Sequence, residues 1–146
     1  MRARRAGRSA FRSRVAAGLK RAVRYGDGWM GAGSSSSADF VQQVGLLRQV
    51  LDEAGRDPAT FPISKRVYVA VDADRDRAER RLREWFALRY KNADMATRVS
   101  IWGSCAECID KLRALVQAGA QHLLLNPVFD EVEHLEVLAR EVMPHV

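Results

Sequence analysis

The chain has 146 residues, of which 47% are hydrophobic and 29% are charged. This length corresponds to one domain, and the composition excludes a chain that is disordered throughout. No run of apolar residues approaches the roughly 18 that a transmembrane helix needs, so we expect no membrane partner.

The formal net charge of +6 is concentrated at one end of the chain. Residues 1–25 contain nine Arg and Lys residues and no acidic residue, whereas residues 26–146 contain 15 basic and 18 acidic residues. The basic segment fits an arm that binds nucleic acid or an anionic surface, an import presequence, or a helix whose packing partners are absent. Phe11 is the only aromatic residue before Tyr25, which argues against an RNA partner. We treat residues 1–19 as a basic arm or helix.

The first half of the chain predicts two helices around a short strand and a loop. Apolar residues at every fourth position predict a helix over 9–24, and the following Gly-Asp-Gly makes Asp27 a turn residue. Trp29 and Met30 form a short apolar strand, in which Trp29 packs in the core or lines a pocket. The loop GAGSSSS follows. A second helix ends at Gly55 and is expected to bury Phe40, Val41, Val44, Leu47, Leu51 and Ala54.

The second half alternates helices and strands. The run ISKRVYVAV (63–71) predicts a strand buried on both faces, and a charged helix follows over about 75–91. Residues 92–103 predict a linker, residues 104–118 a helix, residues 121–127 a strand, and Asp130 the cap of a final helix. The expected buried side chains are Leu82, Trp85, Phe86 and Leu88 in the charged helix and Val132, Leu135, Leu138 and Val142 in the final one. Strands joined by helices predict an α/β fold with a parallel sheet.

The only two cysteines, Cys105 and Cys108, form a C-x-x-C pair. A zinc site needs a second such pair, which the chain lacks. Ser104 and Glu107 instead fit a capping box, which places Cys108 on the apolar face of the following helix. We therefore expect two free thiols without redox or metal function, which suits a reducing cytoplasm.

Five motifs in collinear order resemble the C-terminal portion of the luciferase-like monooxygenase superfamily, whose members are flavin- or deazaflavin (F420)-dependent oxidoreductases. They are AVRYGDGWM, LDEAGRDP, RVYVAV, IWGSCAECIDKLRALVQAGAQHLLL and LEVLAREVMP. The resemblance covers residues 20–146 and implies part of a TIM (β/α)₈ barrel. It assigns the last three barrel strands to Trp29–Ala32, Ser64–Val71 and His122–Asn126, and it leaves the first five strands missing.

Three strands cannot close a barrel, and they would leave unpaired edges and an open apolar face. We therefore expect a C-terminal fragment of a flavin- or F420-dependent oxidoreductase or monooxygenase that acts on an unknown small organic substrate. We expect it to be inactive unless missing sequence, a second copy or another chain completes the sheet. A non-enzymatic module whose basic arm binds nucleic acid is the alternative.

The chemistry of a TIM barrel lies at the carboxyl ends of its strands, which selects residues 30–35, 72–74 and 126–129. The resemblance implies that the first of these loops contacts FMN or F420. Its candidate cofactor-binding residues are Gly31, Ala32, Gly33, Ser34 and Ser35. The backbone N–H groups ahead of a helix N-terminus favour anions there, although a flexible serine-rich connector fits the same residues. The loop has serine where some relatives that oxidise sugar phosphates have lysine, which argues against such a substrate.

We expect Met30, Arg98 and Asn126 to contact the substrate, although a solvated side chain explains Arg98 as well. No catalytic residue is assigned, because the sequence offers no nucleophile–base pair, no paired carboxylates at a strand end and no metal cluster. His122 would begin a strand at the end opposite the chemistry. The catalytic residues of the family come mostly from strands that this chain lacks, so none is carried over.

Overall fold

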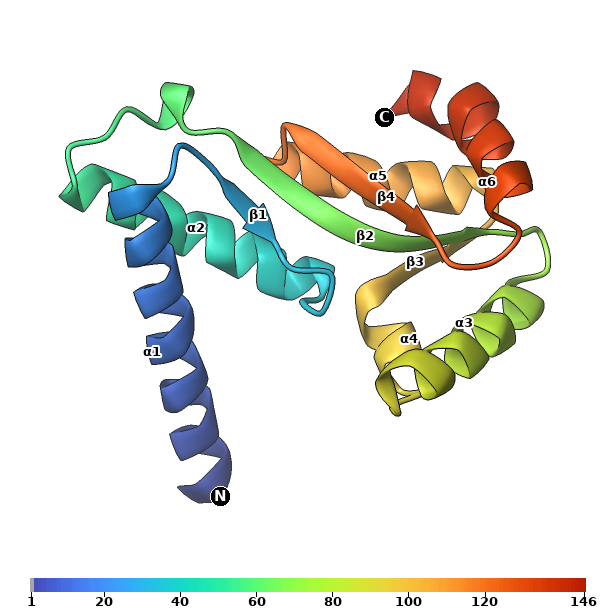
Figure 1. Cartoon of the computed structure of the whole chain (residues 1–146), viewed down its shortest axis with the longest axis horizontal. Helices are drawn as coiled ribbons and strands as arrows, with labels where there is room; N and C mark the ends of the chain where they lie inside the picture. Colours follow the sequence, from blue (N-terminus) through green and yellow to red (C-terminus); the bar gives the residue numbers. More distant parts are fainter. Residues whose placement is uncertain (1) are drawn as a thin grey trace.

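The computed structural model describes the backbone of residues 2–146 and the side chains of residues 14–146. The helices are α1 (Arg2–Tyr25), α2 (Ser37–Glu53), α3 (Arg75–Tyr90), α4 (Met95–Val99), α5 (Cys105–Ala118) and α6 (Glu131–Val137). The strands are β1 (Trp29–Gly31), β2 (Ile63–Val71), β3 (Ser100–Gly103) and β4 (His122–Pro127). A 3₁₀ turn (Pro58–Thr60) precedes β2, and a π-helical turn (Leu138–Val142) and a 3₁₀ turn (Met143–His145) follow α6 (Figure 1).

All strands of the sheet are parallel, and β2 pairs with each of the others. The first three residues of β2 pair with β1, its last four pair with β3, and Ser64–Val69 pair with β4. Figure 1 shows β4 on one side of β2 and β1 and β3 on the other. The predicted α/β fold with a parallel sheet is confirmed.

The structure adds one strand to the three that the sequence predicted. Residues 100–103, which fell in the predicted linker, form β3, and the preceding residues 95–99 form the short helix α4. The strand has only four residues, and only the middle two, Ile101 and Trp102, are large and apolar. Such a run is too short to show the alternation that identifies a strand.

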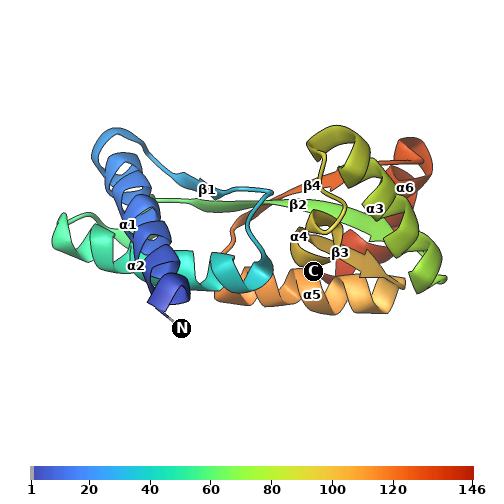
Figure 2. The same cartoon turned by 90° about the horizontal axis from the view of Figure 1, so that it is seen from below.

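Helices cover both faces of the sheet (Figure 2). On one face, α1, α2 and α5 bury a core against Ile63, Val67 and Val69 of β2. On the other face, α3 and α4 cover only the carboxyl-terminal half of β2, where Tyr68 packs against Phe86 and Ala70 belongs to the same core. The amino-terminal half of this second face has no helix over it among the elements described.

Helices α2 and α5 on the first face begin and end as the sequence predicts. The hydroxyl groups of Ser36 and Ser104 accept hydrogen bonds from the third helical N–H of α2 and α5, and both helices have the full capping box. Gly55 follows α2 with a φ of 64°. This left-handed conformation costs glycine little, whereas a residue with a side chain adopts it only at a cost in free energy. In α5, Cys108 is fully buried, as expected.

Four large apolar residues expected in the core are exposed instead: Val41, Leu88, Val132 and Leu135. The buried stripe of α3 is Ala78, Leu82 and Phe86, at four-residue spacing. Leu88 lies two residues beyond Phe86, which turns it about 200° away from that stripe. Likewise, His134, Leu138 and Val142 form the buried stripe after β4, so Val132 and Leu135 face outward. Ala54, the C-cap of α2, is also exposed.

Asp130 precedes α6, but its side chain makes no cap hydrogen bond, contrary to the prediction. Its backbone is left-handed, with a φ of 45°, and its carboxylate is held by Arg81 of α3. An ion pair with a distant element thus replaces the local cap. Asp27 does lie in the turn between α1 and β1, where it is exposed.

Helix α1 begins well before the predicted residue 9, and it turns Leu19 and Val23 into the core. The side chain of Phe11 lies outside the described residues. Arg56 ties the end of this helix to the body, because its guanidinium donates to the carbonyls of Val23 and Gly26 at 2.7 Å.

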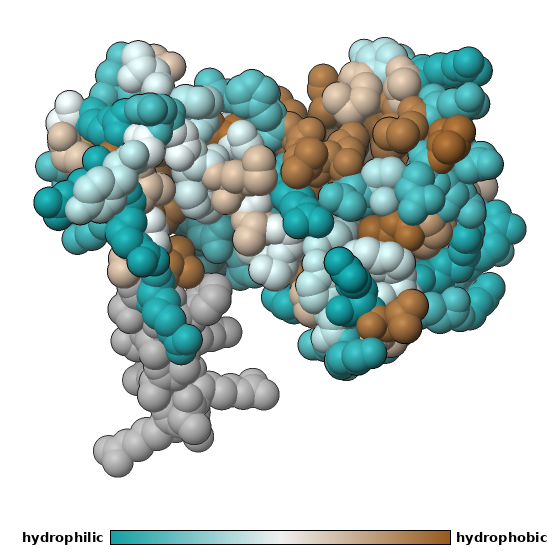
Figure 3. All heavy atoms as spheres, viewed as in Figure 1, coloured by the Kyte–Doolittle hydropathy of each residue, from teal (hydrophilic) through white to brown (hydrophobic). Residues whose placement is uncertain are grey.

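The uncovered half of the sheet exposes apolar side chains, as expected for an incomplete barrel. Met30 of β1 is 51% exposed and Leu124 of β4 is 48% exposed, and Figure 3 shows apolar atoms gathered over β4. Among the described strands, β4 pairs only with β2, so its outer edge has no strand beside it. No helix in the described part of the chain is long and apolar enough to cross a membrane.

Candidate functional site

The loop that follows β1 is held by a buried lysine. Lys65 of β2 donates hydrogen bonds to the Ala32 carbonyl at 2.5 Å and to the carbonyl and hydroxyl oxygens of Ser35 at 2.8 and 3.0 Å. The Ser35 hydroxyl in turn donates to the Ala32 carbonyl at 2.7 Å. These four bonds fix residues 32–35 as a tight turn and already use the Ser35 hydroxyl.

Lys65 is only 2% exposed, and its ammonium lies 5.9 Å from the centre of the Phe40 ring. Burial lowers its pKa to about 8, and the nearby carboxylate of Asp39 opposes that shift. The ammonium is the form that satisfies all three loop oxygens, because it has three N–H donors and the neutral amine has only two. Lys65 therefore fixes the conformation of the loop from the sheet face that α1, α2 and α5 cover.

The partial positive charge at the N-terminus of α2 is already neutralised by a carboxylate of the same helix. Asp39 accepts a hydrogen bond from the Ser36 N–H at 3.0 Å, and the Ser36 hydroxyl accepts from the Asp39 N–H. The Asp39 carboxylate thus takes the place of the anion that a helix N-terminus attracts. The N–H groups of Gly33 and Ser34, by contrast, make no hydrogen bond within the described residues.

Gly33 lies directly over two side chains of the second sheet face, the half-buried Arg66 and the buried Tyr68. A Cβ atom on Gly33 would stand 2.9 Å from Cε2 of Tyr68 and 3.3 Å from Cδ of Arg66. The guanidinium of Arg66 lies 5.2 Å from the centre of the Tyr68 ring, and the Tyr68 and Tyr90 hydroxyls are 2.6 Å apart. Burial, followed by that hydrogen bond, raises the pKa of Tyr68 to about 12, so the phenol stays protonated.

The structure gathers the expected substrate contacts around this face. Met30 is in register with Ser64, and Asn126 is in register with Tyr68, so both point to the same face as Arg66. Arg98 reaches the loop from α4 and donates to the Ser34 carbonyl at 3.3 Å. Trp29 points the other way and stacks on Phe40 in the core.

Arg66 and Tyr68 are the members of this face that the sequence did not predict. The run RVYVAV is almost continuously apolar, so its sequence does not reveal which side chains alternate between the two faces of the sheet. Counting by twos from the buried Val67 and Val69 would have placed Arg66, Tyr68 and Ala70 on the opposite face.

A second polar cluster lies at the carboxyl ends of β2 and β4. Arg77 binds Asp72 through two hydrogen bonds of 2.8 and 2.6 Å, and Arg81 binds Asp130. These hydrogen bonds are the main cause of the lowered pKa of each carboxyl group, so both stay ionised and are unsuited to donate a proton. The cluster lines a cavity of about 410 Å³, together with His134 and Phe129.

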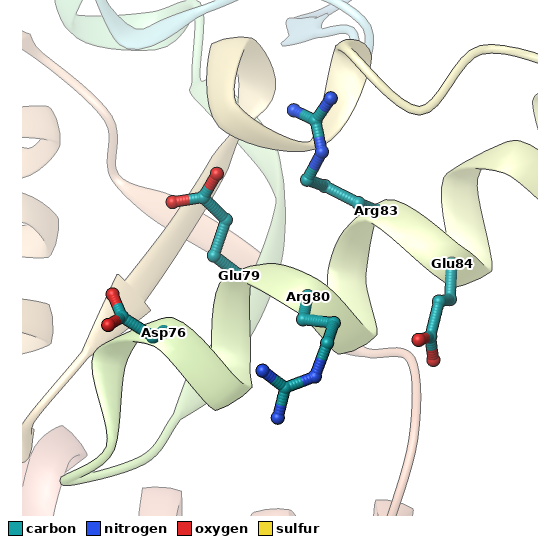
Figure 4. A pocket seen from close by; sticks show the side chains of 5 residues that line it. All are labelled: Asp76, Glu79, Arg80, Arg83 and Glu84. Carbon is teal, nitrogen blue, oxygen red and sulfur yellow. The ribbon is translucent and has the colours of Figure 1, made fainter.

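A further hollow, on the outer side of α3, does not form a site. Asp76, Glu79, Arg80, Arg83 and Glu84 line it, and all five come from one helix (Figure 4). Figure 4 shows their side chains fanning outward, with Arg83 directed toward α4, where it binds Asp94. In the described part of the chain, no three His, Cys, Asp or Glu side chains are grouped to hold a metal ion.

A family model described as luciferase-like monooxygenase matches residues 13–122. The chain belongs to the luciferase-like monooxygenase family. No curated protein matches it.

Solved structures support the fold of this luciferase-like chain. An F420-dependent secondary alcohol dehydrogenase, in complex with an F420–acetone adduct, is 21% identical with a TM-score of 0.74, and the match covers 90% of this chain and 46% of that one. The F420-dependent tetrahydromethanopterin reductase of Methanopyrus kandleri is also 21% identical, with a TM-score of 0.67 and coverages of 87% and 47%. The monooxygenase RslO1 of Streptomyces bottropensis is 17% identical, with a TM-score of 0.55 and coverages of 89% and 45%. The chain spans slightly under half the length of these proteins, and it represents part of a TIM barrel.

Proposed function

We propose that this chain forms one wall of a flavin- or F420-dependent oxidoreductase that acts on a small organic substrate. The observation that carries the proposal is the open sheet face beside the loop at residues 32–35, in a chain of the luciferase-like monooxygenase family. The face is the one that turns inward in a closed barrel, and the loop follows the carboxyl end of a strand, where barrel enzymes hold their ligands.

The loop fits a cofactor better through its backbone than through its hydroxyls. The Ser35 hydroxyl and the carbonyls of Ala32 and Ser35 are bound to Lys65, whereas the N–H groups of Gly33 and Ser34 have no acceptor in the described structure. We propose that these two N–H groups and the Ser34 hydroxyl hold FMN or F420. The cofactor would supply the redox chemistry, in the form of O₂ activation by a reduced flavin or hydride exchange by a deazaflavin.

The remaining residues of the face bind and orient the substrate in this proposal. Met30 offers an apolar surface, Asn126 an amide, and Arg98 a charge that its bond to Ser34 places at the loop. The open sheet edge leads us to propose that further strands, from a second copy or another chain, complete the pocket and exclude water. The two cysteines are free, which fits a reducing cytoplasm.

Titration of the purified chain with FMN and with F420, followed by cofactor fluorescence, tests the proposal. We expect one of them to bind with a dissociation constant of tens of micromolar or less. Gly33→Ala should weaken this binding at least tenfold, because the new Cβ would push the loop off Tyr68. Gly45→Ala is the matched control, because a Cβ there meets nothing within 4 Å. If neither cofactor binds at tens of micromolar, the proposal is wrong.

A further inference from the structure

Arg66 is a half-buried cation that the described structure leaves without a counter-charge. Its Nε atom is buried and has no hydrogen-bond acceptor, and no described carboxylate lies within 4 Å of its guanidinium. Several other arginines of the body are bound to carboxylates, namely Arg56, Arg75, Arg77, Arg81 and Arg83. A buried donor without an acceptor is costly, so the position of Arg66 needs a reason.

The surroundings hold the guanidinium ready for a ligand. Arg66 comes from the middle of the central strand, its guanidinium lies against the Tyr68 ring, and Gly33 closes over its aliphatic part. These contacts limit the directions that the guanidinium can take, and Arg66 alternates with the core-facing Val67, so it projects from the second face of β2. Preorganisation of this kind lowers the entropy that a side chain loses on binding.

The loop that lies over Arg66 carries further cations and donors. Arg98 lies against the same loop, at the Ser34 carbonyl, and Lys65 binds the loop from the opposite face. The N–H groups of Gly33 and Ser34 add two donors without partners in the described part of the chain. Asp39 is the one nearby carboxylate that these contacts involve, and it is engaged by Ser36 at the start of α2.

We propose that Arg66 binds the anionic oxygens of a ligand on the open face, either a phosphate or a carboxylate group. This rests on the proposed function only in taking the open face as the ligand site. The planar guanidinium binds two oxygens of such a group in parallel, which a lysine ammonium does not reproduce. Arg66 is thus the residue that selects ligands carrying a negative charge.

Binding of inorganic phosphate and of acetate, measured by calorimetry at constant ionic strength, tests this inference without any cofactor. We expect Arg66→Met to weaken binding of at least one of these anions by tenfold or more, and Arg66→Lys to weaken it less. Arg80→Met is the matched control, because Arg80 is exposed on the outer side of α3, and it should change nothing. Thermal unfolding of each variant checks the fold, and Arg66→Lys keeps the test valid if the methionine variant unfolds.

Two results would overturn the inference: wild-type chain that binds neither anion, or Arg66→Met that binds both as tightly as the wild type does. The first result would mean that Arg66 pairs with a carboxylate of another protein segment.

If an anion binds, titration with FMN and with riboflavin, which lacks the phosphate, identifies the source of the anion. Selective loss of FMN binding in Arg66→Met assigns the site to the cofactor phosphate, and unchanged binding of both flavins assigns it to the substrate. Flavin binding with no anion binding would refute the role of Arg66 and leave the proposed function standing.

Discussion

Lys65 stabilises the loop after β1, but burying its charge in the core costs free energy. Its ammonium replaces water by three protein oxygens, but it lies in the same core as Phe40 and Val67. The cost appears as a pKa of about 8 instead of the usual 10.5. At neutral pH the ammonium is still the main form, and the Asp39 carboxylate favours it.

The lowered pKa predicts a specific pH dependence of stability. Between pH 8 and 10.5 the unfolded chain holds the Lys65 proton more firmly than the folded chain does, so the free energy of unfolding rises with pH. Relative to Lys65→Met, the wild type should gain about 1 kcal/mol between pH 8 and pH 9. Urea unfolding of both proteins at each pH measures this difference.

Cys108 acts in the opposite sense in both proteins, so its contribution cancels in their difference. Burial raises the pKa of its thiol to about 11, so above pH 9 the unfolded chain loses that proton first and folding becomes less favourable. A constant difference between the wild type and Lys65→Met from pH 7 to pH 9 would show that Lys65 is not buried as described.

At the scale of elements, the start of α2 is the link between the loop and the core. Ser36 ends the loop and caps the helix, and the helix carries Phe40, which packs against Trp29 and beneath Gly31. A change at this cap should therefore loosen both the helix and the candidate site.

Adjacent serines give a matched test of the cap. Ser36→Ala removes the acceptor for the Asp39 N–H and should lower the free energy of unfolding by about 1 kcal/mol. Ser37→Ala alters the first helical residue without touching the capping box, and it should stay within roughly 0.5 kcal/mol of the wild type. Equal effects of the two substitutions in denaturant unfolding would contradict the assigned cap.

Local signals predicted most elements, and distant contacts decided the rest. The caps at Ser36 and Ser104 and the glycine stop at Gly55 depend on neighbours within a few residues, so the sequence was sufficient for them. The exposure of Leu88 and the Asp130–Arg81 pair depend on which helix stripe meets the sheet, which a single sequence does not specify. The site followed the same rule: the loop was predicted, whereas Arg66 and Tyr68 emerged only from the register of β2.

At the scale of the whole molecule, the sheet has an apolar face without a cover over half of its length. Met30 and Leu124 are about half exposed there, and β4 has no neighbour on its outer edge among the described strands. An exposed strand edge beside apolar side chains is a surface that other chains readily join.

We therefore predict that the purified chain self-associates. Light scattering should give a mass well above 16.4 kDa, and Met30→Lys combined with Leu124→Lys should move it toward the monomer. Leu88→Lys is the control, because Leu88 is 75% exposed on α3, away from the open face, and it should change nothing. A wild-type chain that is monomeric at tens of micromolar would contradict self-association through the open face.

The central claim is that the ligand lies on the open face, at the loop between β1 and α2. Backbone amide NMR of the chain, titrated with FMN or F420, tests it directly. The account predicts that the largest shifts fall on Gly33, Ser34 and Asn126, and that they shrink in Gly33→Ala. Shifts confined to the cavity at Asp72, Asp130 and His134 would contradict it.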